Sequence, residues 1–150
     1  MKITSTAFRD GEKIAALYTC EGQNISPPLA WRNVPQGTKS LALIMDDPDA
    51  PSGIFTHWVV FNIPAVTVNL PAAAKSANLP AGTLQGRNSY GTSTYGGPCP
   101  PPGSPHHYRF TLYALDQPVA LAAGVTREQL LSAARSHILA QARLVSLYQR

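Results

Sequence analysis

Three strand-length segments constrain the fold of this chain most strongly, because each is largely apolar and is bounded by residues that favour turns. They are SLALIMD (40–46), HWVVFNI (57–63) and YRFTLYAL (108–115). The first two are mostly apolar runs, as buried strands are, and in the third polar and apolar residues partly alternate. A shorter segment, LVSLY (144–148), adds a candidate closing strand. These segments predict a fold made mainly of β-strands.

The remaining sequence favours loops and one helix near the C-terminus. Residues 65–105 are rich in Pro, Gly, Ser and Asn and are interpreted mainly as loops. The residues TREQ (126–129) form a capping box, in which the Thr126 side chain caps the amide of Gln129 and the glutamine side chain reaches back. Apolar residues then recur at helical spacing to give one face: Leu130, Leu131, Ala134, Ile138 and Ala142.

These elements predict one domain over residues 1–150, since the sequence shows no internal repeat and no long linker. The chain has 14 prolines, 11 glycines and only 13% charged residues, a mixture that suits a loop-rich β or α+β domain better than a helical bundle. Strands come first and one substantial helix follows near the end. We therefore expect an antiparallel-leaning β-sandwich with a few peripheral helices.

The charge pattern narrows the class of partner. The net charge is +4, but Lys and Arg are scattered and no RNP-like aromatic motif is present, which argues against nucleic-acid binding. Anionic small molecules or surfaces are the better match. No segment approaches the ~18 apolar residues of a membrane span, and the N-terminal residues MKITSTAFRDG lack the apolar stretch of a secretory signal. We expect a cytoplasmic protein, unless a leader precedes this sequence.

Two short polar stretches flank the predicted strands. DDPDAP (46–51) follows the first strand, and its composition is typical of an acidic turn. If the segment is extended instead, Asp47 and Asp49 point to the same side. His57 stands at the start of the second strand, where it is expected to share a face with Val59 and Phe61. A lone histidine in that setting is usually a packed core or edge residue, so its interest depends on its neighbours.

The stretch GGPCPPPGSPHHYRF (96–110) supplies candidate neighbours. If the third strand extends back by two residues, His106, Tyr108 and Phe110 share one face and His107 points the other way with Arg109. The prolines have no N–H, so a bound anion would need backbone donors from other residues of the loop: Gly96, Gly97, Cys99, Gly103 and Ser104. The stretch is either a cradle for a small oxyanion or a rigid crossover loop.

Together the motifs resemble the phosphatidylethanolamine-binding protein family, in its bacterial Raf-kinase-inhibitor-like branch. The resemblance rests on the helix near the C-terminus and on five segments in the family's order: NISPPLAW (24–31), DDPDAPSG (46–53), HWVVFNIP (57–64), GRNSYG (86–91) and YGGPCPPPGSPHHYRFTLYALD (95–116). It implies a β-sandwich-like fold with a small pocket at one end, which binds phosphate-type anions and phospholipid head groups.

Carried over to this sequence, the resemblance implies a ligand-binding set of Asp47, His57, Pro100, His106 and Tyr108, with Gly97 nearby. Ser89 stands where GRND-type sequences have an acidic residue. Cysteines often occur in this branch near the positions of Cys20 and Cys99, which implies a disulfide between them if the pocket loop folds back on the N-terminal segment. Otherwise the two residues are expected to be reduced thiols.

The expected function is that of a non-enzymatic binding protein without a cofactor. It would bind a phosphate-bearing ligand or a phospholipid head group and modulate a kinase or another phosphoprotein partner, as a homodimer. In that pocket Asp47 would hydrogen-bond a histidine and favour its charged form, so that binding weakens as pH rises through the histidine range. The alternatives are a metal-dependent or other hydrolase built on the two histidines and the aspartate, and an interaction protein with a vestigial pocket. The sequence has no H-x-E-x-x-H, C-x-x-C or G-x-S-x-G motif to support a hydrolase.

Overall fold

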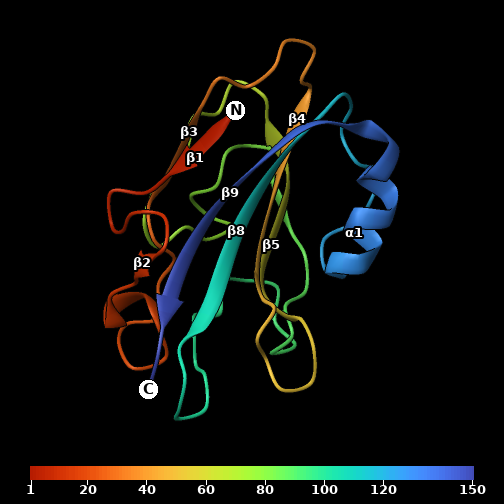
Figure 1. Cartoon of the computed structure of the whole chain (residues 1–150). Coiled ribbons are helices and arrows are strands. Elements are labelled where there is room, and N and C mark those ends of the chain that lie inside the picture. The colour runs from red at the N-terminus through yellow and green to blue at the C-terminus, as the bar shows by residue number, and fades with distance from the viewer.

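The computed structural model describes residues 1–150, and its strands form two sheets packed face to face (Figure 1). The smaller sheet has the order β1-β3-β6, with the strands Lys2–Thr4, Leu29–Arg32 and Asn69–Leu70. The larger sheet has the order β2-β9-β8-β4-β5-β7, with the strands Glu12–Lys13, Ile138–Tyr148, His106–Leu115, Ser40–Asp47, Phe55–Pro64 and Leu84–Gln85. All neighbouring strands are antiparallel except β2 and β9. The prediction of a mainly β sandwich with peripheral helices is confirmed.

The main core lies between the two sheets. In β3 the side chains alternate, so Leu29 and Trp31 point into the core while the residues between and after them point to solvent. They belong to one buried cluster with the inner face of the large sheet, which includes Leu43, Met45, Trp58, Val60, Phe110 and Leu112. This packing fixes the large sheet, and with it the strand ends that carry the candidate site.

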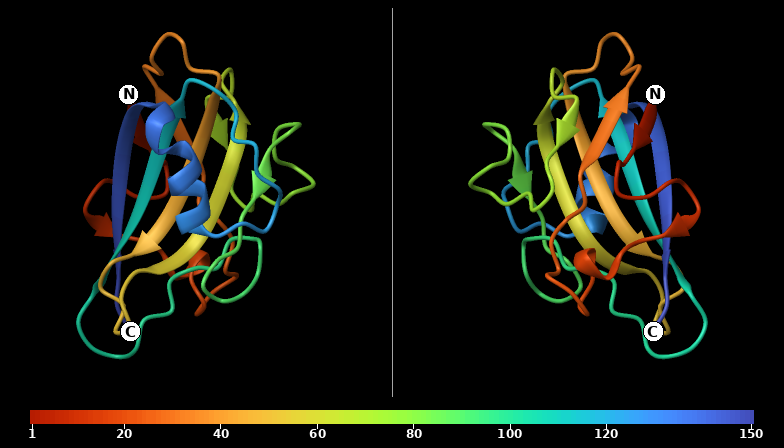
Figure 2. Two further views of the ribbon diagram at one scale, coloured as in Figure 1. Left: turned by 90° about the vertical axis from the view of Figure 1, so that its right-hand side faces the viewer. Right: turned by 90° about the vertical axis from the view of Figure 1, so that its left-hand side faces the viewer.

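A second buried cluster covers the opposite face of the large sheet. The α-helix α1 (Arg127–Ala134) lies over that face (Figure 2). Its buried residues Leu130 and Ala134 pack with Ala42, Ile44, Val59 and Phe61 of β4 and β5. Because β4 is covered on both faces, all eight of its residues are buried, which explains why its sequence is a mostly apolar run rather than an alternating one.

The helix begins as predicted and ends earlier than predicted. The capping box is present: the Thr126 hydroxyl accepts a hydrogen bond from the amide of Gln129, and the Gln129 side chain accepts one from the amide of Thr126. After Ala134 the chain passes through a 3-10 turn (Arg135–His137) into β9. Ile138 and Ala142 therefore lie in a strand, because β9 pairs with β8 from Ile138 to Tyr148 and satisfies its backbone groups there.

A bulge in β5 changes the direction of His57. Met45 pairs with Trp58 and Asp46 pairs with Thr56, so His57 is an extra residue opposite β4. Val59 and Phe61 belong to the cluster beneath α1, whereas His57 lines a pocket on the other side of the sheet. The expectation that these three residues share a face is wrong, because it assumed a regular strand.

Two further features complete the fold. A short 3-10 helix, Ala16–Tyr18, lies in the N-terminal segment between β2 and β3. None of the helices has the length and apolar character that crossing a lipid bilayer requires.

Candidate functional site

Three strands bring polar side chains together at one end of the large sheet. β4 is antiparallel to both β5 and β8, so its last residues lie beside the first residues of those two strands. This places Asp47 at the end of β4 near His57 in β5 and His106 and Tyr108 in β8. The β4–β5 loop, the loop before β8 and the C-terminal residue lie at the same end of the molecule, at the bottom of Figure 1.

These side chains line a cavity of about 200 Å³. The cavity has 11 lining residues: Asp47, Ala50, Pro51, Phe55, His57, Tyr90, Cys99, Pro100, Pro101, His106 and Tyr108. Five of the six residues that the family resemblance assigned to the ligand are among them, and Gly97 is not. A water molecule occupies about 30 Å³ of liquid, so the cavity has room for a phosphate group with a short substituent but not for a whole phospholipid.

Asp47 orients the imidazole of His106. The Nδ1 atom of His106 lies 2.6 Å from Oδ2 of Asp47, and both side chains are largely buried. The other carboxylate oxygen of Asp47 accepts a hydrogen bond from the amide of Asp49 at 2.8 Å. Because the Nδ1 proton is held by the carboxylate, Nε2 is the nitrogen of His106 that is left for a ligand. Asp47 also neutralises the charge that His106 carries when both ring nitrogens are protonated.

His57 is held as a neutral ring. Its Nδ1 atom donates a hydrogen bond to the carbonyl of Gly96 at 2.7 Å, so the neutral form has a free lone pair on Nε2. Burial lowers the pKa of His57 below its ordinary value, despite the opposing effects of the Gly96 carbonyl and the Asp47 charge. The rings of Phe55, Tyr90 and Tyr108 surround it, with centroid distances of 4.9, 5.7 and 5.2 Å.

Tyr108 presents a buried hydroxyl without a partner. The residue has 0% of its surface exposed, and its hydroxyl makes no hydrogen bond within the protein. Burial, and then the negative charge of Asp47, raises the pKa of Tyr108, so the group stays protonated at neutral pH. The great majority of buried polar groups have a hydrogen-bond partner, and a buried donor without one costs free energy. Here that donor belongs to a residue that lines the cavity.

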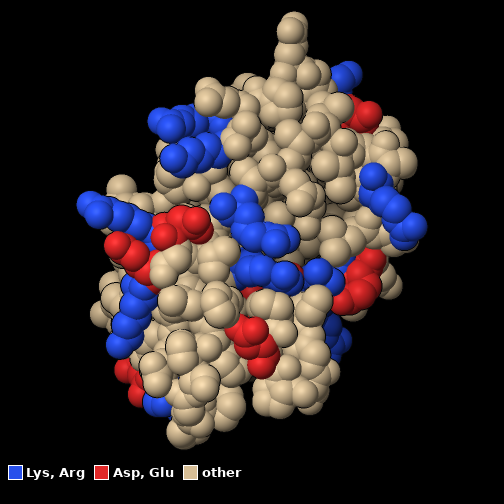
Figure 3. Space-filling view, viewed as in Figure 1, with Lys and Arg blue, Asp and Glu red and all other residues tan.

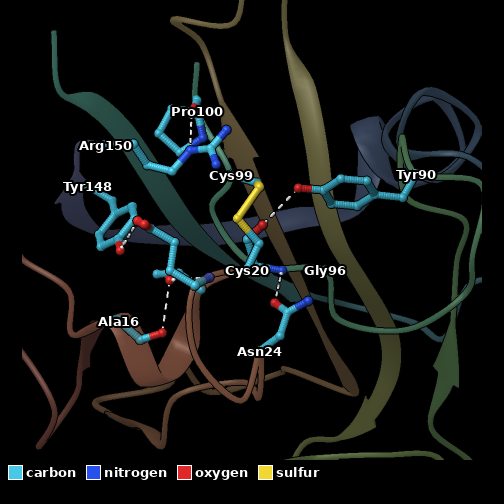
Figure 4. Close-up of a disulfide and its surroundings, with 12 residues drawn as sticks. Ala16, Cys20, Asn24, Tyr90, Gly96, Cys99, Pro100, Tyr148 and Arg150 are labelled. Carbon is cyan, nitrogen blue, oxygen red and sulfur yellow. Dashed lines mark hydrogen bonds between the residues drawn. A yellow bond between two sulfur atoms is a disulfide. The ribbon is translucent and has the colours of Figure 1, made fainter. Parts of the chain in front are cut away.

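A cross-linked loop forms the remaining wall. Cys20 and Cys99 form a disulfide that joins the N-terminal segment to the loop before β8 (Figure 4). On its other side the loop is held by Arg150, whose Nε donates to the carbonyl of Pro100 at 2.6 Å. The Tyr90 hydroxyl donates to the carbonyl of Gly97 at 2.8 Å. These contacts hold Cys99, Pro100 and Pro101 at the edge of the cavity.

Most of the backbone donors expected for an anion are used by the protein itself. The amides of Gly96, Gly97 and Gly103 donate to the carbonyl of His57, to the side chain of Asn24 and to the carbonyl of Arg150. Of the five expected donors, only the amides of Cys99 and Ser104 make no hydrogen bond, and only Cys99 lines the cavity. The loop therefore acts mainly as a scaffold that can offer one backbone donor.

Gly97 has a packing role behind the cavity wall. A Cβ atom at this position would lie 2.3 Å from the carbonyl oxygen of Tyr18 and 2.4 Å from Oδ1 of Asn24. Only glycine lets the loop approach the N-terminal segment this closely. The family resemblance placed Gly97 near the ligand, and in the structure Gly97 shapes the cavity wall without lining it.

The second carboxylate of the acidic stretch lies outside the cavity. Oδ2 of Asp49 accepts hydrogen bonds from Nδ1 and from the amide of His107, at 2.7 and 2.8 Å. Burial would raise the pKa of Asp49, but the hydrogen bonds from His107 outweigh it and the pKa is lowered. The side chains of Asp47 and Asp49 thus bind the two diverging histidines of β8. The alternative that both point to the same side is wrong, because the chain turns after Asp47.

The arrangement differs from a metal centre. No group of three or more His, Cys, Asp or Glu side chains is positioned to hold a metal ion. Asp47 and His106 are hydrogen-bonded to each other, and the Nδ1 atom of His57 is hydrogen-bonded to a carbonyl.

The sequence analysis did not predict the aromatic residues Phe55 and Tyr90 in the cavity wall. Phe55 could have been found from its pairing with Asp47 once the bulge was known.

Comparisons with known proteins agree with the fold and the motifs. Residues 4–149 match the family described as phosphatidylethanolamine-binding protein. A UPF0098 protein of Methanothermobacter thermautotrophicus is 50% identical over 100% of this chain and 99% of its own length. A UPF0098 protein of Aquifex aeolicus is 45% identical over 100% of this chain and 89% of its own length.

Two crystal structures resemble the whole chain. The putative phosphatidylethanolamine-binding protein homologue CT736 of Chlamydia trachomatis has 42% identity and a TM-score of 0.91, over 99% of this chain and 97% of that one. YbcL of E. coli, described as a member of the mammalian PEBP family, has 36% identity and a TM-score of 0.94, over 99% and 98%. The chain belongs to the phosphatidylethanolamine-binding protein family.

Proposed function

We propose that this chain is a non-enzymatic binding protein whose cavity takes one phosphate-type oxyanion. The observation that carries the proposal is the hydroxyl of Tyr108, which is buried, protonated and without a partner within the protein. Tyr108 lines the cavity together with two histidines whose Nδ1 atoms are both engaged, so each histidine can offer only Nε2. An oxyanion would supply the acceptor that the Tyr108 hydroxyl lacks.

The ligand contacts follow from the protonation of these groups. Tyr108 donates through its hydroxyl, and His106 donates through Nε2 when it is protonated and paired with Asp47. Cys99 can add its backbone N–H. The lone pair on Nε2 of neutral His57 can accept a hydrogen bond from an oxyanion that still carries one proton. A phosphate monoester loses its second proton at a pH of about 6, and the form that keeps this proton can donate it to the His57 lone pair.

The cavity dimensions favour the phosphate end of a larger molecule. A phospholipid head group and a phosphorylated side chain of a partner protein, including a kinase, present the same tetrahedral oxyanion. The rings of Phe55 and Tyr90 would contact a short substituent on the phosphate, and an ammonium group is attracted to the faces of such rings. Membership of the phosphatidylethanolamine-binding protein family supports an ethanolamine substituent in particular.

Calorimetric titration with inorganic phosphate, O-phosphoethanolamine and a phosphoserine peptide tests the proposal. His106→Ala should lower the affinity for all three by at least about tenfold, because a charged hydrogen-bond donor is lost. His107→Ala is the matched control: it removes the adjacent imidazole, which lies on the other side of the strand, and should leave the affinity within about twofold.

The probe that binds most tightly shows whether the cavity prefers free phosphate, a phospholipid head group or a phosphorylated protein side chain. Thermal unfolding of both variants shows whether the fold is retained. Equal affinity in the wild type and His106→Ala would contradict the proposed site. Failure of the wild type to bind any of the three probes would contradict the proposed function.

A further inference from the structure

A row of arginines crosses the face of the large sheet opposite the cavity. Arg109 is in β8, Arg143 is in β9 and Arg127 is the first residue of α1. We call these three residues the arginine row. Basic side chains form a blue band across the middle of this face, over β9 and β8 towards α1 (Figure 3). No contact of the proposed phosphate site involves any of them.

The strand register places the three side chains next to one another. Arg143 is paired with Thr111, and Arg109 precedes Thr111 by two residues, so Arg109 and Arg143 are diagonal neighbours on one face. Arg109 and Arg127 bind the same carboxylate: their Nε atoms lie 2.7 and 3.2 Å from the two oxygens of Asp46. Asp46 is buried and holds the two guanidinium groups on either side of it.

Each guanidinium is anchored through its inner nitrogen. Nε of Arg109 and of Arg127 binds Asp46, and Nε of Arg143 donates to the hydroxyl of Thr111 at 3.1 Å. The terminal nitrogens of Arg109 and Arg143 make no hydrogen bond in the protein, and one terminal nitrogen of Arg127 makes a long contact of 3.5 Å with Glu128. Orientation of the side chains before binding reduces the entropy that a ligand must offset. The row thus combines an exposed side chain, Arg143, with two partly buried ones, Arg109 and Arg127, whose side chains are 22% and 18% exposed.

The charge of this surface is not balanced by the protein. Arg109 and Arg127 share the buried carboxylate of Asp46, and Arg127 also pairs with the exposed Glu128, whereas Arg143 has no acidic partner. Beside the row, a groove of about 420 Å³ runs along α1 and contains a fourth arginine, Arg135. The groove is also lined by the acidic Glu128 and by apolar and neutral polar side chains, among them Tyr113, Leu131 and Ile138. Four arginines and two carboxylates leave this surface with a net positive charge, so a matching partner carries negative charge and some apolar contact area.

We propose that the arginine row docks an extended acidic segment of a partner protein. Diagonal neighbours across a strand pair are about 7–8 Å apart, and alternate side chains of an extended peptide are about 6.6–6.8 Å apart. Carboxylates at alternate positions can therefore each meet one guanidinium edge in a two-bond arrangement. A membrane surface fits less well. Interfacial binding needs apolar side chains that project beside the charges and insert into the lipid, whereas the apolar side chains near the row lie within the groove.

Fluorescence anisotropy with a labelled peptide of five Glu-Ser repeats tests this assignment. The wild type should bind with an affinity that falls steeply as salt is added, since the contacts are ionic and exposed. Arg143→Gln should weaken binding by about tenfold, because a charged donor pair is lost. Arg143→Lys keeps the charge but not the planar fork, so it should also weaken binding and shows that geometry matters.

Arg32→Gln is the matched control. It removes the same charge from the exposed face of β3 in the smaller sheet and should change the affinity by less than about twofold if the row is the site. His106→Ala should leave peptide binding intact, which separates this surface from the phosphate cavity. The proposal is overturned if the wild type does not bind the peptide or if Arg143→Gln and Arg32→Gln have equal effects. It is also overturned if the row binds phosphatidylserine vesicles or a single-stranded oligonucleotide more tightly than the peptide.

Discussion

Removal of the Tyr108 hydroxyl should affect phosphate affinity and folding stability in opposite directions. Tyr108→Phe should leave the unliganded protein as stable as the wild type or more so, because a buried hydroxyl without a partner is removed. The same change should weaken phosphate binding by about tenfold through loss of a donor to a charged ligand. Thermal unfolding and calorimetric titration measure the two effects.

Tyr95→Phe provides the comparison. The Tyr95 hydroxyl is in a buried residue and donates to the carbonyl of Tyr18 at 2.7 Å, so its loss should cost about 1 kcal/mol of stability without changing phosphate affinity. If the two variants lose the same stability, or if Tyr108→Phe binds phosphate normally, the role given to Tyr108 is wrong.

His57 predicts a specific pH dependence of stability. Its pKa is lowered from an ordinary value of 6.5 in the folded protein, so the unfolded chain takes up a proton first as pH falls. The free energy of unfolding should therefore decrease as pH drops below about 6.5, by at most about 1.4 kcal/mol per pH unit for this one group. Urea unfolding of the wild type and His57→Gln between pH 7.5 and 5.5 measures it. Equal slopes in the two proteins would contradict the assignment of His57 as a buried neutral ring.

At the scale of elements, the disulfide is what ties the loop before β8 to the N-terminal segment. The double variant Cys20→Ser/Cys99→Ser opens a cross-link with a sequence separation of 79 and should lose about 3–4 kcal/mol of stability. Phosphate affinity should also fall, because Cys99 and the prolines after it form the wall. Denaturant titration and calorimetry in the presence and absence of a dithiol reductant check both effects. The reductant should affect the wild type only, and unchanged affinity in the variant would mean that the remaining contacts hold the loop.

The strands and the helix start could be predicted from local sequence, whereas their irregularities could not. Alternation along β8 correctly separated His106 from His107, since that part of the strand is regular. The same reasoning failed for His57, because the bulge opposite β4 depends on pairing between strands and leaves no periodic signal. The predicted helix is longer than the observed one for a related reason. Ile138 and Ala142 fit a helical spacing, but they form part of β9 because that segment pairs with β8.

At the scale of the whole molecule, two adjacent residues of β4 serve opposite faces of the sheet. Asp47 binds His106 at the cavity, and Asp46 binds Arg109 and Arg127 on the other face. The sequence motif marked both aspartates, but only resemblance to the family selected Asp47, and nothing local indicated that arginines from β8 and α1 would meet at Asp46. That convergence comes from tertiary packing across 63 and 81 residues of sequence. The fold thus keeps the proposed oxyanion cavity and the arginine row apart by the thickness of one sheet.

The cavity at Asp47, His57, His106 and Tyr108 is proposed to bind a phosphate-type oxyanion. The most direct test is a crystal soaked in selenate, a tetrahedral anion whose selenium atom is located by anomalous scattering. We expect an anomalous peak inside the cavity, with oxygen atoms within about 3 Å of the Tyr108 hydroxyl and of Nε2 of His106. An empty cavity in crystals whose selenate peaks lie only elsewhere, such as on the arginine row, would contradict it.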